Sequence, residues 1–179
     1  MKSKLIFLLL IVFFISCDNP TPRKPVVRKS STFLKESIQR NKIINKLEEE
    51  ARLQLMARDS SHLYLSSTNG FWYYYISRDS TSTKLPELGD EVFYSYDIKN
   101  INGEVLYTMD ELGDRSYLVD KQELITGLQD GLKLMKEGEV VTFLFHSHKA
   151  YGYSGYKNIG SNQPLIYSVT VNKIVFDNQ

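Results

Sequence analysis

Cysteine is nearly absent from this sequence, with Cys17 the only one in 179 residues. A chain with one cysteine can form neither an internal disulfide nor a cysteine metal cluster. An excess of charge is also lacking, because 22 basic side chains stand against 21 acidic ones, and 20 against 21 without Lys2 and Lys4. A strongly basic surface is the mark of nucleic-acid binding, so we expect no nucleic-acid partner.

Motifs that hold a metal or a nucleotide are missing as well. The acidic residues between positions 109 and 116 lack the spacing of a calcium loop, and we interpret them as surface charge. His146 and His148 are two apart on a predicted strand, but no third ligand is near and His62 is distant in the sequence. We interpret this pair as exposed histidines at a strand end and expect no metal and no cofactor.

Long hydrophobic runs are absent too, since a membrane-spanning helix takes roughly 20 apolar residues. The longest run extends from Leu5 to Ile15 and follows Lys2 and Lys4, a pattern typical of a cleaved signal peptide. We therefore expect residues 1–16 to be removed.

The expected cleavage site resembles the bacterial lipobox, in which a small residue precedes a cysteine that receives the lipid. The run here is Phe14-Ile15-Ser16-Cys17, with Phe14 in place of the usual leucine. Lipidation of Cys17 predicts a protein anchored to a membrane of the cell envelope, with the periplasmic side of the outer membrane favoured. The alternative is an ordinary secretory signal that leaves a free thiol.

Residues 17–32 are predicted to be the lipidated cysteine and a proline-rich tether. Three of the five prolines lie here without apolar periodicity, which favours a stiff, extended linker. Its basic side chains could contact anionic headgroups, although a solvated linker is the simpler interpretation. We expect this segment to hold a domain away from a bilayer.

An N-terminal segment over residues 33–60 is predicted to contain a helix from Phe33 to Arg58. Thr32 can cap its start, and Asp59 can end it. Its apolar stripe packs either on the chain's own domain or on a second copy or another protein, and no heptad repeat is long enough for a coiled coil. The stripe comprises Phe33, Leu34, Ile38, Ile43, Ile44, Leu47, Ala51, Leu55 and Met56.

Strands are predicted from position 61 onward. Residues 61–84 contain one aromatic strand, Phe71 to Ser77, and a polar connecting loop. The turn signal Asn102-Gly103 joins two further strands, and residues 109–116 are predicted as a loop. Alternation in three strands places one set of side chains on a common face: Val92, Tyr94, Tyr96, Ile98, Val141, Phe143, Phe145, Leu165, Tyr167, Val169 and Val171.

The segment 119–139 predicts a short buried helix around which these strands are arranged. Asp120 is the expected N-cap, with Glu123 as its capping-box partner. Gly127 and Gly131 weaken a helix but allow a curved sheet to approach its backbone. The fold class is therefore α+β, with a curved antiparallel sheet wrapped around a short helix and preceded by an N-terminal helix. Residues 149–163, rich in glycine and tyrosine, form a loop of the kind that borders a site.

Several motifs occur in a fixed order between Leu85 and Val175. They are Tyr96 before the hairpin Gly103, Gln122-Glu123-Leu124-Ile125 followed by Gly127, Lys136-Glu137-Gly138-Glu139, Tyr151-Gly152-x-x-Gly155, and Leu165-x-Tyr167-x-Val169. Together they resemble the FKBP-type peptidyl-prolyl isomerases, with residues 85–179 as the isomerase domain. The whole chain most resembles the FKBP-type lipoproteins associated with gliding motility in Bacteroidetes.

This resemblance implies a site for rotating X-Pro peptide bonds. Tyr96, Ile125 and Tyr151 are the implied catalytic residues, with the Tyr151 hydroxyl and the Ile125 backbone N–H holding substrate carbonyls. The implied substrate-binding residues are Leu106, Leu124, Leu128, Ile159 and Tyr167. Four positions depart from the family: Leu106-Tyr107 replaces Phe-Asp, Leu128 replaces a common tryptophan, and Tyr167 replaces a phenylalanine.

The sequence therefore predicts a membrane-anchored prolyl isomerase that helps proline-containing exported or envelope proteins to fold, including those of a gliding motility machinery. The alternative is a non-catalytic FKBP-like chaperone or binding module that docks onto envelope proteins. The helix over residues 33–58 offers a contact to a partner or a second copy in either case.

Overall fold

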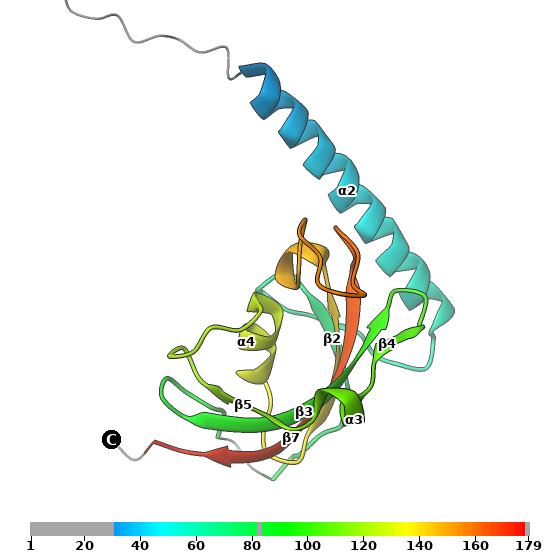
Figure 1. Cartoon of the computed structure of the whole chain (residues 1–179). Helices are drawn as coiled ribbons and strands as arrows, with labels where there is room; N and C mark the ends of the chain where they lie inside the picture. Colours follow the sequence, from blue (N-terminus) through cyan, green and yellow to red (C-terminus); the bar gives the residue numbers. More distant parts are fainter. Residues whose placement is uncertain (1–30, 82–83, 178–179) are drawn as a thin grey trace, which may run out of the picture. The chain divides into compact units, whose positions relative to one another are not determined.

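The computed structural model describes residues 31–81 and 84–177 (Figure 1). The predicted signal peptide, Cys17 and nearly all of the tether lie outside the described residues. The chain divides into two compact units, Met1–Ser37 and Ile38–Gln179, each considered by itself. The described part of the first unit is the beginning of helix α2, which runs from Ser31 to Arg58. No helix in the described ranges is long and apolar enough to cross a membrane.

The second unit is built on one antiparallel sheet of seven strands. Its order is β1-β2-β6-β7-β3-β4, with β5 pairing beside β4 on β3. The long strands β3 and β7 pair along their whole length, from Glu91↔Val175 to Asn100↔Leu165. The strands are β1 Leu65–Ser66, β2 Trp72–Ser77, β3 Glu91–Asn100, β4 Val105–Tyr107, β5 Arg115–Leu118, β6 Val140–Phe145 and β7 Leu165–Val175.

One face of this sheet forms the hydrophobic core, as the alternation in the sequence predicted. Residues on β3, β6 and β7 that were assigned to a common face are all buried, at 9% exposure or less. Burial of such a set stabilises the fold by about 1.5–3 kcal/mol for each large apolar side chain. The predicted fold class is confirmed.

Helix α4, Thr126–Leu132, packs against this face (Figure 1). Its two glycines, Gly127 and Gly131, allow the close approach. A Cβ atom on Gly127 would lie 2.9 Å from the ring of Phe145, and one on Gly131 would lie 3.0 Å from the ring of Phe143. Both distances are shorter than ordinary van der Waals contact. The expectation that a sheet approaches the helix backbone at these glycines is confirmed.

The start of this helix was predicted wrongly. Asp120 has φ 55°, which is incompatible with the extended backbone of an N-cap, and its carboxylate accepts a hydrogen bond from Lys133 Nζ at 2.9 Å. Residues 119–125 form turns and extended chain, and Ile125 is the N-cap, without a side-chain hydrogen bond. Helical spacing of apolar residues was present, but tertiary packing on the sheet confines the helix to seven residues.

The segment predicted as a loop after β4 contains two further elements. Helix α3, Met109–Leu112, begins with a capping box in which Thr108 and Glu111 bond to each other's backbone N–H groups. Strand β5 follows and pairs with β3, opposite residues 91–94. Glu111 is therefore a capping residue as well as a surface charge.

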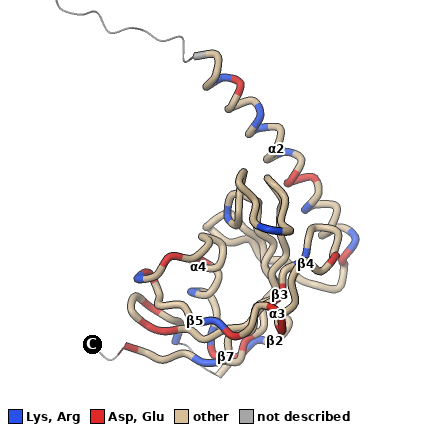
Figure 2. Tube along the Cα trace, in the orientation of Figure 1, with Lys and Arg blue, Asp and Glu red and all other residues tan. Residues whose placement is uncertain are grey.

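Helix α2 contacts the sheet through charged side chains. From Ile38 onward, Glu48 and Arg52 are buried, at 4% and 9% exposure, whereas Ile43 and Leu47 are exposed. The Arg52 guanidinium lies 4.9 Å from the centre of the Trp72 ring on β2 and pairs with Glu49. Basic and acidic residues are interspersed along α2 (Figure 2). The predicted apolar stripe is thus only partly used, with Ile44, Ala51, Leu55 and Met56 half-buried.

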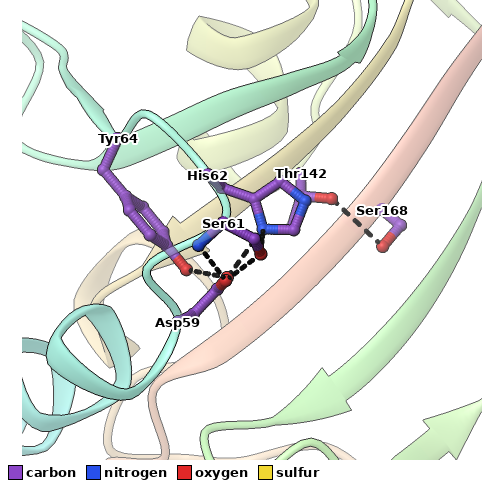
Figure 3. A network of polar contacts seen from close by, with 6 residues as sticks. All are labelled: Asp59, Ser61, His62, Tyr64, Thr142 and Ser168. Atoms are coloured by element: carbon purple, nitrogen blue, oxygen red, sulfur yellow. Dashed lines mark hydrogen bonds and ion pairs between the residues drawn. The ribbon is translucent and has the colours of Figure 1, made fainter.

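A network of polar contacts follows the end of α2 at Arg58 (Figure 3). The Asp59 carboxylate accepts hydrogen bonds from the Ser61 hydroxyl at 2.6 Å and from the Tyr64 hydroxyl at 2.7 Å, and it binds His62 Nδ1 at 2.8 Å. The His62 ring stacks on Tyr74 of β2, with ring centres 4.1 Å apart. These contacts fix the turn between α2 and the sheet.

His146 is not the exposed histidine that the sequence predicted. It follows the last residue of β6, is half-buried, and lies 3.1 Å from the Glu48 carboxylate through Nδ1. Its ring stacks on that of His148 at 5.5 Å, so the two side chains do lie together. The missing information was the position of α2, which brings the carboxylate of Glu48 to this point.

Candidate active site

A cavity of about 330 Å³ opens between the sheet and the loop that follows β6. Its lining comes from strands β3, β4 and β5, from helix α3 and from the loop of residues 149–163. The lining residues are Tyr96, Ile98, Tyr107, Glu111, Leu112, Arg115, Tyr151, Tyr156 and Lys157.

Tyr96 is fixed in this cavity by ring stacking. It lies on β3 between Tyr94 and Tyr167, with ring centres 5.6 Å apart on both sides. Burial raises the pKa of the Tyr96 hydroxyl, and the neighbouring Tyr151 adds to the effect. Like any tyrosine hydroxyl it is protonated at neutral pH, so it can donate a hydrogen bond.

Tyr151 lies on the loop and faces the same cavity. Its ring stacks on Tyr156, with centres 5.2 Å apart. The backbone is held by hydrogen bonds from Gly152 N to Ser147 O and from Asn162 N to Gly152 O, both 2.8 Å long. Burial raises the pKa of the Tyr151 hydroxyl. This group is also protonated and a donor at neutral pH, as tyrosine ordinarily is.

Gly155 explains the glycine spacing of this loop. Its φ is +64°, and a Cβ atom there would lie 2.5 Å from the Ile159 carbonyl oxygen. Ile159 and Tyr156 form a bridge closed by two backbone hydrogen bonds of 2.8 and 2.9 Å. The motif Tyr151-Gly152-x-x-Gly155 thus gives the loop a compact turn that aims Tyr151 at the cavity.

Tyr107 occupies the position at which the FKBP pattern has an aspartate. Its hydroxyl accepts a hydrogen bond from the backbone N–H of Asn158 at 3.2 Å. The substitution therefore ties β4 to the loop across the cavity. The charged carboxylate of the family pattern is replaced here by the neutral Tyr107 hydroxyl, which is hydrogen-bonded to the backbone of Asn158.

The structure brings only some of the predicted site residues to the cavity surface. Tyr96 and Tyr151 line it, whereas Leu128, Ile159 and Tyr167 are buried in the core and Leu106, Leu124 and Ile125 are half-buried against that core. All eight belong to one connected hydrophobic cluster.

The Tyr167 hydroxyl is a special feature of this core. It is buried, and the nearby polar group with which it interacts is the Tyr151 hydroxyl. Burial raises the pKa of Tyr167, and the nearby Tyr151 contributes. Tyr167 does not line the cavity, so its hydroxyl is linked to the site only through Tyr151.

Three charged lining residues were missed by the sequence analysis. Glu111 and Arg115 lie in the segment that was predicted as a loop, and Lys157 lies in the loop bordering the site. The capping box of Thr108 and Glu111 was visible in the sequence and could have revealed α3. The position of Arg115 depends on the pairing of β5 with β3, for which the sequence gives no turn signal.

The arrangement suits the binding and twisting of a neutral amide. It offers protonated hydroxyls and aromatic rings, and within the described residues no group of three or more histidine, cysteine, aspartate or glutamate side chains could hold a metal. Rotation about an amide bond breaks no covalent bond, so it requires neither a nucleophile nor a metal ion.

Comparison with known proteins gives the family. The family model of the FKBP-type peptidyl-prolyl cis-trans isomerases matches residues 82–172, about half of the chain. FkpA from Escherichia coli has the same fold, with a TM-score of 0.60 and 18% identity over 97% of this chain and 82% of that one. A peptidyl-prolyl cis-trans isomerase from Pseudomonas syringae pv. tomato gives a TM-score of 0.57 and 17% identity, over 72% of this chain and 94% of that one. A search of curated proteins found no match. This chain belongs to the family of FKBP-type peptidyl-prolyl cis-trans isomerases.

Proposed function

We propose that this isomerase acts at a membrane of the cell envelope, where it assists the folding of exported proteins that contain proline. The observation that supports catalysis most directly is the pair of hydroxyl donors, Tyr96 and Tyr151, that line one cavity above an aromatic core. An unassisted X-Pro bond isomerises in tens to hundreds of seconds, which is slow enough to limit folding.

The rate enhancement follows from the surroundings of the amide. Resonance gives the C–N bond double-bond character and a rotation barrier of about 18–20 kcal/mol. Water stabilises the planar, charge-separated amide, whereas the rings of Tyr96 and Tyr156 that line the cavity offer no such stabilisation. The twisted amide is therefore favoured relative to the planar one. The Tyr151 hydroxyl holds a flanking carbonyl so that only the X-Pro bond rotates.

Isomerisation is tested with a proline peptide whose cis and trans forms are resolved by NMR exchange. A catalysed exchange rate that rises in proportion to protein concentration supports the enzyme. If exchange in the presence of the protein equals that of the peptide alone, the chain is a binding module.

The proposed location rests on the signal-like N-terminus and Cys17. Two or more acyl chains anchor a protein firmly, whereas one chain of myristoyl length binds only marginally. Wild type should remain in the membrane fraction after a high-salt wash, and Cys17→Ser should lack acyl label and be mislocalised or uncleaved. Recovery of wild type in the salt-soluble fraction would rule out the anchor.

A non-catalytic chaperone or binding module is the second candidate. Two observations favour it: Tyr107 replaces the family aspartate, and α2 leaves Ile43 and Leu47 exposed, one turn apart on the same side of the helix. We propose this face of the helix as a contact to a client protein or to a second copy. Sedimentation of wild type beside Ile43→Glu/Leu47→Glu distinguishes the two, because only pairing between copies changes the mass of the isolated protein.

The most specific part of the proposal is a role in gliding motility. It rests only on the resemblance of the sequence to the FKBP-type lipoproteins associated with gliding. Deletion of the gene in a gliding bacterium that carries it should reduce colony spreading. Normal spreading would contradict this role without affecting the isomerase activity.

A further inference from the structure

Two cationic side chains from separate elements line the cavity. Arg115 is the first residue of β5, and Lys157 lies in the loop after β6. Arg115 is directly opposite Tyr94 in the antiparallel pairing of β5 with β3. Residues opposite each other in such a pair point to the same face, so Arg115 shares the face of Tyr94 and Tyr96.

Lys157 is placed by the aromatic stack of the loop. Its ammonium lies 5.2 Å from the centre of the Tyr156 ring, and that ring stacks on Tyr151. The backbone at Lys157 has φ 49°, a left-handed conformation that the turn of the loop imposes. The positive charge is therefore held beside the hydroxyl that we assign to carbonyl binding.

Neither cation is neutralised by an ion pair in the described part of the protein. The one carboxylate of the cavity lining, on Glu111, is engaged elsewhere. It accepts hydrogen bonds from the Thr108 backbone N–H at 2.8 Å and from the Thr108 hydroxyl at 3.1 Å. The cavity thus combines apolar rings with an excess of hydrogen-bond donors and one net positive charge.

We propose that this cavity selects prolines that have an acidic side chain on an adjacent residue. The proline ring lies on the aromatic surface, and the carboxylate of a neighbouring aspartate or glutamate pairs with Arg115 and Lys157. An arginine is well suited to this task, because its planar guanidinium binds a carboxylate through two parallel hydrogen bonds. The proposal rests on the proposed isomerase function and adds its substrate class.

The size of the preference follows from the exposure of the two cations. Arg115 and Lys157 are both exposed, and an exposed ion pair contributes only modestly because solvent screens it. Two such pairs predict an overall preference of about three- to tenfold for glutamate over its neutral isostere glutamine. Since salt screens exposed charges, the preference should shrink as ionic strength rises.

The test uses the full-length protein in detergent and peptides that differ at one position. One series carries Glu, Gln or Lys before the proline and the second carries them after it, so that the two positions are distinguished. Catalysed exchange is measured by NMR, and binding is measured by titration of the same peptides. Wild type should prefer Glu over Gln and Gln over Lys in at least one series.

Variants connect the preference to the two residues. Arg115→Gln and Lys157→Gln should each lower the ratio of the Glu rate to the Gln rate, and the double variant should bring it close to one. Lys173→Gln removes an exposed cation of β7 that does not line the cavity, so it should leave the ratio and the basal rate unchanged. Thermal unfolding of each variant shows whether it is folded.

The outcomes separate this proposal from the proposed function. Equal binding and turnover of the Glu and Gln peptides by wild type would overturn the acidic preference and leave the isomerase intact. A preference in binding without any catalysed exchange would support the acidic preference and overturn catalysis. A ratio that survives in the double variant would show that other residues carry the selectivity.

Discussion

The carboxylate of Glu48 accepts two hydrogen bonds from Ser147, 99 positions later in the chain: one from the backbone N–H at 2.9 Å and one from the hydroxyl at 2.5 Å. Ser147 in turn accepts the Gly152 N–H through its carbonyl, next to Tyr151. Helix α2, which lies outside the residues that match the family, therefore supports the loop that carries a candidate catalytic residue.

Glu48→Gln should destabilise the protein. The new amide offers one acceptor where two donors of Ser147 must be satisfied, and a buried donor left unpaired costs about 1–3 kcal/mol. Chemical denaturation should show this loss in the free energy of unfolding. Glu50→Gln, an exposed substitution on the same helix, is the matched control and should change the unfolding midpoint little.

Acid should weaken the same contact. Burial alone would raise the pKa of Glu48, but hydrogen bonds from His146 and Ser147 outweigh it, and the pKa of the folded state is lowered below 4.5. A lowered folded pKa stabilises the protein above the unfolded pKa, and this contribution is lost as the pH falls through the folded value. Unfolding curves of wild type and Glu48→Gln should therefore converge below pH 4.5. A stability difference that stays constant down to pH 2 would contradict the assignment.

Tyr151→Phe should lower the isomerase rate several-fold with little change in melting temperature. The ring and its stacking on Tyr156 remain, and the loss is one hydrogen bond to substrate, worth about 0.5–1.5 kcal/mol. Tyr153→Phe removes a hydroxyl from the same loop, where the side chain is 74% exposed, and should keep the full rate. A large drop in melting temperature for Tyr151→Phe would identify Tyr151 as a core residue.

Gly127→Ala should destabilise the fold by about 1–3 kcal/mol, because the added methyl group would press on the Phe145 ring and on the Lys149 carbonyl oxygen. Helix propensity alone predicts the opposite sign, since alanine favours a helix. Gly160→Ala is the control, because its Cβ would meet only the end of the Gln163 side chain. Thermal unfolding of the two variants decides between packing and propensity.

The strands could be predicted from the sequence because alternation and burial coincide. Tyr94 and Tyr96 on β3 and Phe143 and Phe145 on β6 all lie where the period of two places them. Helix α4 was harder, since the apolar spacing continues through residues that the fold holds in turns. Asp120 has the residue type of an N-cap but the backbone of a left-handed turn.

The candidate site was predictable only where a motif fixes local structure. Tyr151 belongs to such a motif, and Gly155 explains why it must lie on a compact turn. Arg115 and Glu48 have no local signal. Arg115 reaches its position through the pairing of β5 with β3, and Glu48 lies on a helix far away in the sequence. Both positions depend on contacts that only the complete fold provides.

The position of β7 has a consequence for how the chain folds. This strand is the last one in the described part of the chain, yet it lies between β6 and β3 in the middle of the sheet. Its pairing with β3 must close a loop of more than sixty residues, so the contact order is high and folding should be slow. During synthesis from the N-terminus, β3 has no neighbour on this side until residues 165–175 have emerged. A chain stopped before that point would present two unpaired strand edges and be prone to aggregate.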